Sequence, residues 1–313
     1  MAPTARTSPF SIPPLPAMLA GAALIGTNGL MVRLAGTPPT VSAFWRMTLA
    51  GAFLCAVVVL TGRWRRQSPA TWAWCLLPAV AFAADLWLWH RSILLVGPGL
   101  ATLLANAQVF FMALAGAVLF GERLGPRFLG GIVLAFVGLW LLLGQGWAQL
   151  PAGYRWGVWL GLATGVCYAA YNIGLRTAQR RAHAGAGQAD GGALLAQVLG
   201  IVSLGCGAVL GLAGLAEGVS FAIPTLRAFW LLLALALVGH CLSWVLISRA
   251  MQALPVALVG LLLLLQPIVA FLLDVAVLGR ATSPREWLGL AASLAGIFLA
   301  GLKGRERLPE QAS

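Results

Sequence analysis

The stretch from Leu103 to Gly138 reads LLANAQVFFMALAGAVLFGERLGPRFLGGIVLAFVG, and the stretch from Leu261 to Gly296 reads LLLLLQPIVAFLLDVAVLGRATSPREWLGLAASLAG. A shift of 158 residues aligns them without a gap, and the alignment extends from about Leu88 to Leu141. Matches of Arg, Gln, Gly and Pro are rarer by chance than matches of Leu in so apolar a chain. The chain therefore contains an internal repeat, with identities at Leu88/Leu246, Arg91/Arg249, Leu103/Leu261, Leu104/Leu262, Gln108/Gln266, Gly121/Gly279, Pro126/Pro284, Arg127/Arg285, Gly131/Gly289 and Gly138/Gly296.

The composition predicts a protein of the lipid bilayer. Of the 313 residues, 60% are hydrophobic and 9% are charged, and the mean hydropathy is +0.91. A soluble domain carries about 25% charged residues because its surface faces water. The apolar residues extend along the whole chain, which indicates many membrane spans rather than a single anchor.

Ten apolar stretches are long enough for helices that cross the hydrocarbon layer. Such a helix needs about twenty residues, and it satisfies its backbone hydrogen bonds internally. Turn residues or charges separate the stretches, and the loops between them are short. The sequence therefore predicts an all-α integral membrane protein with ten transmembrane helices, at residues 17–35, 41–61, 71–95, 98–120, 127–144, 156–176, 191–214, 227–250, 256–278 and 285–303.

The repeat divides these ten spans into two halves of five. Because five is odd, the second half enters the membrane from the opposite side, so we expect two inverted-topology five-helix repeats. Halves of this kind can exchange conformations about an axis in the membrane plane, which suits transport by alternating access. The predicted segments are an N-terminal cytoplasmic tail (1–16), the first repeat (17–144), a connecting loop (145–155), the second repeat (156–303) and a C-terminal cytoplasmic tail (304–313).

The positions of Lys and Arg predict the orientation. If the N-terminus is inside, 13 of the 20 basic residues fall on the cytoplasmic side, and this bias favours both termini in the cytoplasm. The basic loops also account for the net charge of +12 without nucleic-acid binding. We expect a multi-pass protein of the inner (plasma) membrane. The 13 are Arg6, Arg63, Arg65, Arg66, Arg123, Arg127, Arg176, Arg180, Arg181, Arg249, Lys303, Arg305 and Arg307.

Short motifs occur in a fixed order along the two halves. They read Gly26-Thr27-Asn28 followed by Arg33, Ala43-Phe44-Trp45-Arg46, Gly99-Leu100-Ala101-Thr102-Leu103-Leu104, Leu119-Phe120-Gly121-Glu122-Arg123-Leu124 followed by Gly130-Gly131, and Leu265-Gln266-Pro267-Ile268-Val269-Ala270. In these motifs the chain resembles the EamA-type ten-helix transporters of the drug/metabolite transporter (DMT) superfamily, over nearly its whole length. The resemblance implies export of amino acids or other metabolites. Departures from the family pattern occur at Ile25, Gln266 and Arg280.

Asp85 is the leading candidate for a functional group inside the membrane. It lies near the middle of the third stretch, and Trp89 follows it by one helical turn. An ionised side chain there costs about 2.5–3.5 kcal/mol unless it faces a partner or a wet cavity. We interpret Asp85 either as a carboxylate that takes up a proton or binds a substrate amine, or as one half of a structural ion pair with Arg46 or Arg91.

His240 lies near the middle of the eighth stretch, which is the repeat counterpart of the third. Trp244 follows it by one turn. Because the repeat relates the two stretches, we expect Asp85 and His240 to approach one another across the pseudo-two-fold axis. A histidine at this depth either relays protons near neutral pH or stays neutral and bonds a neighbouring helix.

The other candidates each have a packing alternative. Arg46 either binds an anionic substrate group or fixes its helix, whereas His90 and Arg91 fit a structural or snorkelling role. Asp274 is expected to pair with Arg280 or Arg285, and Glu122 to form a boundary ion pair. Uncharged polar groups either hydrogen-bond between helices or line a cavity, and these are Asn28, Asn106, Gln108, Tyr168, Tyr171, Asn172 and Gln266.

These features favour a secondary carrier of a small organic metabolite, coupled to protons, over two alternatives. A lipid- or prenyl-modifying enzyme needs clustered carboxylates or a paired nucleophile and base, and the sequence shows no such spacing. A small-solute channel is compatible with the short loops. No ATP-binding loop, metal-ligand spacing or cofactor motif occurs in the sequence. The expected partners are a small-molecule substrate, protons and lipid. The sequence does not determine the oligomeric state, and it is compatible with a monomer.

Overall fold

The computed structural model describes residues 13–120, 125–143, 146–184, 191–253 and 262–301. These residues form helices joined by short loops and contain no strand. The elements are α1 (Pro14–Gly26), α2 (Asn28–Ala35), α3 (Pro39–Leu60), α4 (Pro69–Val96), α5 (Pro98–Ala105), α6 (Gln108–Phe120), α7 (Pro126–Leu143), η1 (Trp147–Gln149), α8 (Ala152–Ala184), α9 (Gly191–Ala216), α10 (Leu226–Ala236), the π-helical segment η3 (Leu237–Leu242), α11 (Ser243–Ala253), α13 (Leu265–Leu278) and α14 (Pro284–Gly301).

Local sequence sets where the helices begin and end. Proline occupies the first turn of α1, α3, α4 and α5, where its fixed φ suits a helix and its missing N–H costs nothing. Gly36 follows α2 and Gly279 follows α13, both with left-handed backbone angles that other residues rarely adopt. These signals were readable in the sequence, and most predicted boundaries in the described residues lie within a few residues of the observed ones. The predicted span 156–176 is an exception, since α8 extends from Ala152 to Ala184.

Each of the ten predicted stretches contains helix, but fewer of these helices are long and apolar enough to cross a membrane. Within the described ranges, seven helical segments are long and apolar enough to cross a membrane. The segments Pro98–Met112 and Leu265–Leu278 are apolar but shorter, and α14 carries Arg285 and Glu286 in its first turn. The residues 254–261, which belong to the predicted ninth span, lie outside the described part of the chain. Length and composition therefore support seven of the ten.

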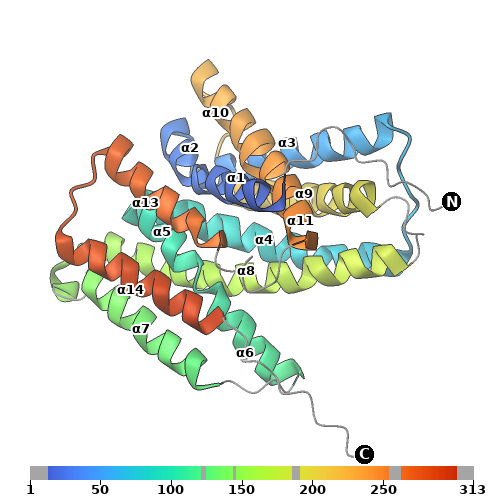
Figure 1. Ribbon diagram of the computed structural model, residues 1–313. Helices are drawn as coiled ribbons and strands as arrows, with labels where there is room; N and C mark the ends of the chain where they lie inside the picture. The colour runs from blue at the N-terminus through green and yellow to red at the C-terminus, as the bar shows by residue number, and fades with distance from the viewer. Residues whose placement is uncertain (1–12, 121–124, 144–145, 185–190, 254–261, 302–313) are drawn as a thin grey trace, which may run out of the picture.

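Helices that are equivalent in the repeat pack against each other in opposite directions. Between α3 and α9 the facing residues are Phe44 with Gly211, Thr48 with Gly207, and Gly51 with Leu204. Residue numbers rise along one helix as they fall along the other, so the two helices are antiparallel. The helices α7 and α14 run side by side in the same antiparallel manner (Figure 1).

The glycines of α7 and α14 reveal the two-fold relationship most directly. Gly131 faces Gly296, and Gly138 faces Gly289. The 158-residue shift makes Gly131 equivalent to Gly289 and Gly138 equivalent to Gly296, so each contact is the repeat image of the other. The antiparallel pairing of equivalent helices is what an inverted-topology arrangement requires.

Three of the predicted spans that contain candidate functional residues are interrupted or change to π-helical geometry in the interior. The first span is interrupted at Thr27, between α1 and α2, and the fourth at Asn106 and Ala107, between α5 and α6. Leu264, the repeat counterpart of Asn106, is likewise a turn residue just before α13. The eighth span contains η3, a π-helical turn that includes His240. Irregular backbone at membrane depth is tolerated where it is enclosed by protein or lines a cavity.

The outer surface is more apolar than that of a soluble protein, and several polar groups are buried in the interior. Large apolar side chains such as Leu60, Val118 and Leu212 are exposed on the outside of the bundle, whereas Arg46, Asp85 and His240 are at most 5% exposed. Exposed apolar surface of this extent fits contact with lipid, since a bilayer imposes no cost on it. The polar groups are consequently concentrated between the helices.

Candidate functional site

Arg46 of α3 and Asp85 of α4 form the charged centre of the interior. Arg46 is 4% exposed and Asp85 is 5% exposed, and the two charges attract each other electrostatically. The Arg46 guanidinium also lies 5.7 Å from the centre of the Trp89 ring, one turn after Asp85. A cation over an aromatic face is stabilised by the ring quadrupole. The two charges are thus electrostatic neighbours, but among the described residues no hydrogen bond or ion pair joins Asp85 to Arg46, and Arg91 pairs with Glu217 instead.

Several polar atoms of this centre lack a hydrogen-bond partner. They are Nε and Nη1 of Arg46, Oδ1 of Asp85, the hydroxyl of Tyr171 and Nδ1 of His240. Buried polar groups are nearly always paired, because leaving one unpaired costs about 1–3 kcal/mol. Unpaired donors and an unpaired acceptor in one buried cluster are suited to water or to a ligand.

Aromatic rings surround the charged centre. The ring of Phe82, on α4, stacks on that of Tyr171, on α8, with centroids 4.1 Å apart and planes 16° apart. Tyr168 lies parallel to Tyr171 at 6.1 Å, and Trp244 of α11 meets Tyr171 edge-on at 6.2 Å. The three helices thus contribute one aromatic wall, which favours an apolar or planar portion of a solute. Phe82 was not among the candidates because a lone phenylalanine in an apolar span carries no signal.

His240 reaches the same cluster from η3. Its ring lies 6.0 Å from Phe82 and 6.5 Å from Trp244, and its Nε2 is 3.3 Å from the Ser203 hydroxyl. In the described part of the chain no hydrogen bond or ion pair joins His240 to Asp85. Both residues instead interact with the Arg46 charge. The approach of Asp85 and His240 therefore stays a prediction.

Asn28 connects the break in the first span to the π-helical segment. Its Nδ2 donates to the Gly239 carbonyl at 3.0 Å, and its Oδ1 is buried without a partner. A Cβ at Gly239 would collide with the Asn28 amide, so the glycine permits this close approach. Of the two interpretations of Asn28, the interhelical hydrogen bond is the one that the structure contains.

Four of the predicted polar residues lie beside the helix breaks rather than in the charged centre. Asn172 donates to Gln108 Oε1 at 2.9 Å, which joins α8 to the start of α6. Asn106 donates to the Thr102 carbonyl within its own turn at 2.8 Å. The Gln266 carbonyl packs against Gly26 of α1. The side chains of Asn106, Gln108 and Asn172 therefore support the break between α5 and α6. His90 is fully buried against Trp89, with ring centroids 5.4 Å apart.

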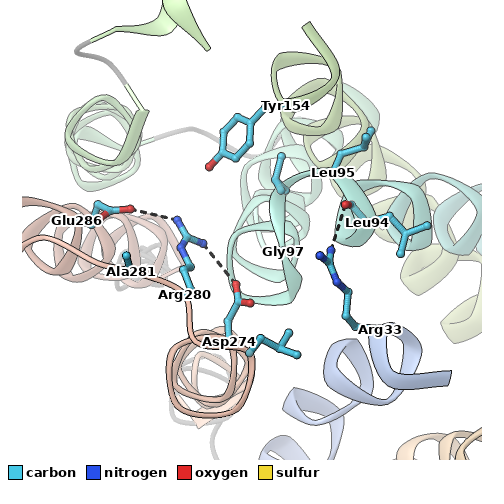
Figure 2. A pocket seen from close by; sticks show the side chains of 11 residues that line it. Arg33, Leu94, Leu95, Gly97, Tyr154, Asp274, Arg280, Ala281 and Glu286 are labelled. Atoms are coloured by element: carbon cyan, nitrogen blue, oxygen red, sulfur yellow. Dashed lines mark hydrogen bonds and ion pairs between the residues drawn. The ribbon is translucent and has the colours of Figure 1, made fainter. Parts of the chain in front are cut away.

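A second polar region lies where α4 ends, in and around a cavity of about 400 Å³ (Figure 2). Arg280 lies between two carboxylates, 3.4 Å from Asp274 Oδ2 and 3.2 Å from Glu286 Oε1. The Tyr154 hydroxyl interacts with Arg280, and Arg33 donates to the Ile93 and Leu94 carbonyls at 3.1 Å each. The predicted pairing of Asp274 with Arg280 is thus confirmed. Glu122 lies outside the described residues.

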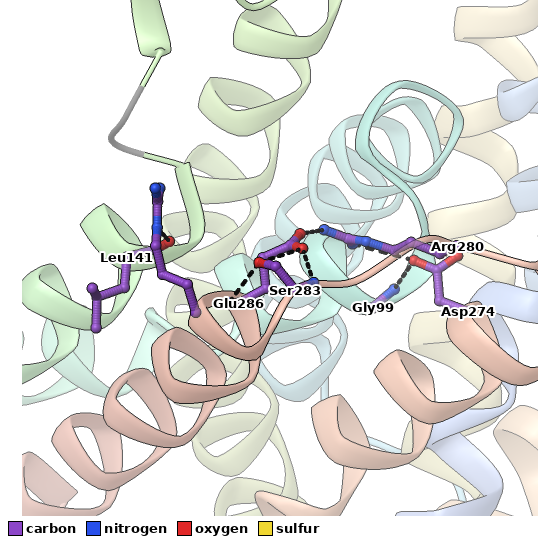
Figure 3. Close-up of polar contacts among 7 residues, drawn as sticks. Gly99, Leu141, Asp274, Arg280, Ser283 and Glu286 are labelled. Atoms are coloured by element: carbon purple, nitrogen blue, oxygen red, sulfur yellow. Dashed lines mark hydrogen bonds and ion pairs between the residues drawn. The ribbon is translucent and has the colours of Figure 1, made fainter.

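Glu286 is held in place by the start of its own helix. Its Oε2 accepts from the Ser283 N–H at 2.8 Å, while its own N–H donates to the Ser283 hydroxyl at 3.3 Å. This reciprocal pair is a capping box, which satisfies backbone donors that the first turn leaves free. Figure 3 shows the chain of contacts from Ser283 through Glu286 and Arg280 to Asp274 and Gly99.

Glu217 forms a separate network at the same end of α4. It follows α9 directly, and its carboxylate accepts from Thr40 at 2.7 Å, from Trp87 at 2.6 Å and from Arg91 at 2.7 Å. Partial burial alone raises the pKa of the Glu217 carboxyl, but these hydrogen bonds and the Arg91 charge lower it overall from its ordinary value. Arg91 was expected to have a structural role, and Glu217 is the partner that sequence reasoning missed.

Comparison with known proteins identifies relatives of the whole chain. The model of the EamA-like transporter family matches residues 13–144 and again residues 155–302. An uncharacterized transporter of Bacillus subtilis (strain 168), YwfM, is 25% identical over 298 residues, which cover 92% of this chain and 93% of that protein. A solved crystal structure of a protein superposes with a TM-score of 0.63 at 22% identity, covering 92% of this chain and 96% of that one. The last similarity concerns the fold alone.

Proposed function

Because this chain belongs to the EamA-like transporter family, we propose that it is a secondary transporter that exports a small organic metabolite, an amino acid or a similar amphipathic solute, by alternating access. The observation that carries this proposal is the buried pair of Arg46 and Asp85, whose free N–H and carboxylate oxygen lie between helices of both halves. The family identity makes the protein a multi-pass membrane transporter. The solute, the direction and the coupling are our proposal.

The chemistry of the centre fits a solute with a carboxylate and an ammonium group. The unpaired Nε and Nη1 of Arg46 can donate to a carboxylate, for which the planar guanidinium is well shaped. The unpaired Oδ1 of Asp85 can accept from an ammonium group. The rings of Phe82 and Tyr171 then offer an apolar surface for the rest of the molecule. An amphipathic zwitterion satisfies all three.

Asp85 provides a simple mechanism for proton coupling. One carboxylate cannot bind an ammonium group and a proton on the same oxygen at once. If Asp85 releases the solute only when it takes up a proton, each conformational cycle exchanges solute for protons. An inward proton gradient would then drive export, with Asp85 as the group that takes up the proton.

The inverted architecture supports alternating access about this centre. We propose ten membrane spans in two five-helix repeats, 17–144 and 156–303, in the inner membrane with both termini in the cytoplasm. The antiparallel pairing of α3 with α9 and of α7 with α14 supports this division. Both halves contribute to the centre, since Arg46 and Asp85 come from the first and His240 from the second. One chain therefore holds a complete site, and a monomer suffices.

Solute exchange in purified proteoliposomes tests the proposal. Cells that overexpress the protein are first screened for resistance to inhibitory amino acids and their analogues. A protective solute, radiolabelled, is then followed in counterflow and in everted vesicles with and without a pH gradient. We expect saturable counterflow and accumulation that depends on the gradient. The matched control is the double variant Arg46→Gln, Asp85→Asn, which removes both charges while both side chains stay polar.

The same assays separate the alternatives. A channel would give non-saturating flux without counterflow, and a lipid- or prenyl-modifying enzyme would convert a labelled lipid without any vesicle transport. Either result would reject the carrier. Equal counterflow in the wild type and the double variant would instead remove the Arg46 and Asp85 centre from the mechanism while leaving the carrier in place.

A further inference from the structure

Two carboxylates of the second half, Glu217 and Asp274, bind groups of the first half at the same end of the molecule. Glu217 follows α9, and Asp274 lies in the last turns of α13. Their first-half partners lie near the C-terminal end of α4, at the N-terminal end of α3 and at the start of α5. Because α4 supplies or adjoins partners of both, the two contacts close one end of the interface between the halves.

Glu217 holds three side chains of the first half together. Oε2 accepts from Thr40, and Oε1 accepts from both Trp87 and Arg91. Arg91 in turn donates to Thr40 at 3.0 Å and lies 3.7 Å from the centre of the Trp87 ring. One carboxylate thus links α3 and α4 to the end of α9. Its removal would release all three donors at once.

Asp274 occupies space that the first half leaves free for it. Gly97 ends α4 with a φ of 86°, and a Cβ there would lie 2.5 Å from Asp274 Oδ2. The same oxygen accepts from the Gly99 N–H at 3.4 Å (Figure 3). The missing side chain at Gly97 therefore permits a carboxylate from α13 to reach the turn between α4 and α5. Arg280 balances the charge from within the second half.

Helix α4 connects the α4-end cavity to the buried centre, and it also carries Trp87 and Arg91, the Glu217 partners. The cavity is lined by Val96 and Gly97 of the first half and by Asp274 and Arg280 of the second (Figure 2). Asp85 lies eleven residues before Val96 on the same helix, or about 16 Å along its axis. Along α4, Trp87 and Arg91 lie between Asp85 and Val96, so the Glu217 contacts occupy the part of the helix between the centre and the cavity.

We propose that Glu217 and Asp274 are two latches of one gate, which closes the route from the α4-end cavity to the Arg46 and Asp85 centre. This inference rests on the proposed alternating-access function. Rocking of the two halves must break contacts at one end of the interface and form others at the opposite end. The Glu217 contacts are partly exposed, so water can replace the lost partners there when the halves separate, whereas the Asp274 carboxylate is buried. Glu217 is the more exposed latch, at 27% for its side chain.

The native Cys206 offers a reporter for this gate. It lies on α9, fully buried, close enough to Arg46 and Asp85 to interact with both charges. In a chain with Cys55, Cys75, Cys167 and Cys241 replaced by alanine, a membrane-impermeant maleimide is added to right-side-out or to inverted vesicles. The rate of Cys206 alkylation then measures access to the centre from one side at a time, without any need for the solute.

We expect the double variant Glu217→Ala, Asp274→Ala to be alkylated about tenfold faster than its parent from one side of the membrane only, since both latches favour the closed state. Glu286→Ala is the matched control: this acid also pairs with Arg280 at the same end, but both partners belong to the second half. It should leave the rate unchanged. If the double variant does not fold, Thr40→Val removes one Glu217 contact without any charge change and should give a smaller increase.

Three results would overturn the gate. They are an unchanged rate in the folded double variant, an equal increase in Glu286→Ala, or an unchanged rate in Thr40→Val when only that variant folds. Each would leave the carrier itself untouched, because solute counterflow tests the carrier independently. Faster alkylation without counterflow would show that the two contacts hold the halves together. It would also reject the proposed transport function, and with it the role of these contacts as a gate.

Discussion

Gly138 of α7 faces Gly289 of α14 at a distance that leaves no room for a side chain on either residue. A Cβ at Gly138 would lie 2.6 Å from the Gly289 carbonyl oxygen, and a Cβ at Gly289 would lie 2.7 Å from the Gly138 oxygen. The repeat image of this contact joins Gly296 to Gly131. Small residues at such positions allow helix backbones to approach closely in the membrane, where packing rather than hydrophobic burial drives association.

The first prediction concerns this glycine contact. Gly138→Val should lower stability by about 1–3 kcal/mol, because the added groups meet the Ser293 and Gly289 backbone and the helices must separate. The measurement is the thermal unfolding midpoint of the detergent-purified protein. Gly130→Ala is the control, since a Cβ there meets only Leu299 at 3.9 Å. Equal midpoints for Gly138→Val and the wild type would contradict the contact.

The second prediction concerns Asp85. Asp85→Asn should abolish gradient-driven accumulation of the solute while the protein still inserts, because an amide neither takes up a proton nor binds an ammonium ion by charge. Uptake into everted vesicles with and without a pH gradient provides the measurement. Asp85→Glu, which keeps the carboxylate, should retain part of the accumulation. Unimpaired accumulation in Asp85→Asn would exclude this residue from coupling.

The third prediction concerns the shape of the Arg46 side chain. Arg46→Lys keeps the positive charge but loses the planar fork whose Nε and Nη1 are free in the structure. We expect half-saturation of counterflow to need about tenfold more solute, since bidentate carboxylate binding is lost. An unchanged half-saturation concentration would mean that Arg46 acts only as a buried counter-charge to Asp85. Normal thermal stability of the variant serves as the control for folding.

The fourth prediction concerns pH and Glu217. The folded chain lowers the pKa of this carboxyl below its ordinary value of 4.5, so the ionised form stabilises the folded state relative to the unfolded state. That contribution is present above the ordinary value and is lost as the pH falls through the lowered pKa. The unfolding midpoint of the wild type should therefore exceed that of Glu217→Gln at neutral pH, and the difference should vanish in acid. A difference that grows on acidification would refute the assignment.

The sequence by itself was sufficient for the helical, membrane-embedded architecture and for the repeat. Apolar stretches, prolines at helix starts and glycines at helix ends are local properties, and they specify helices wherever a bilayer surrounds the chain. The mid-span positions of Asp85 and His240 also marked them as candidates, because an ionisable side chain at that depth is costly unless it faces a partner or a wet cavity. Seven of the ten predicted spans meet the length and composition expected of membrane helices in the described residues.

Only the tertiary structure decided which of these groups meet. It made Arg46 an electrostatic neighbour of Asp85, and it paired Glu217 with Trp87, a residue 130 positions away. A single glutamate after an apolar stretch carries no local signal of its partner. The physical reason is that helix formation depends on neighbours three or four residues apart, whereas hydrogen bonds between the two halves depend on how whole helices pack.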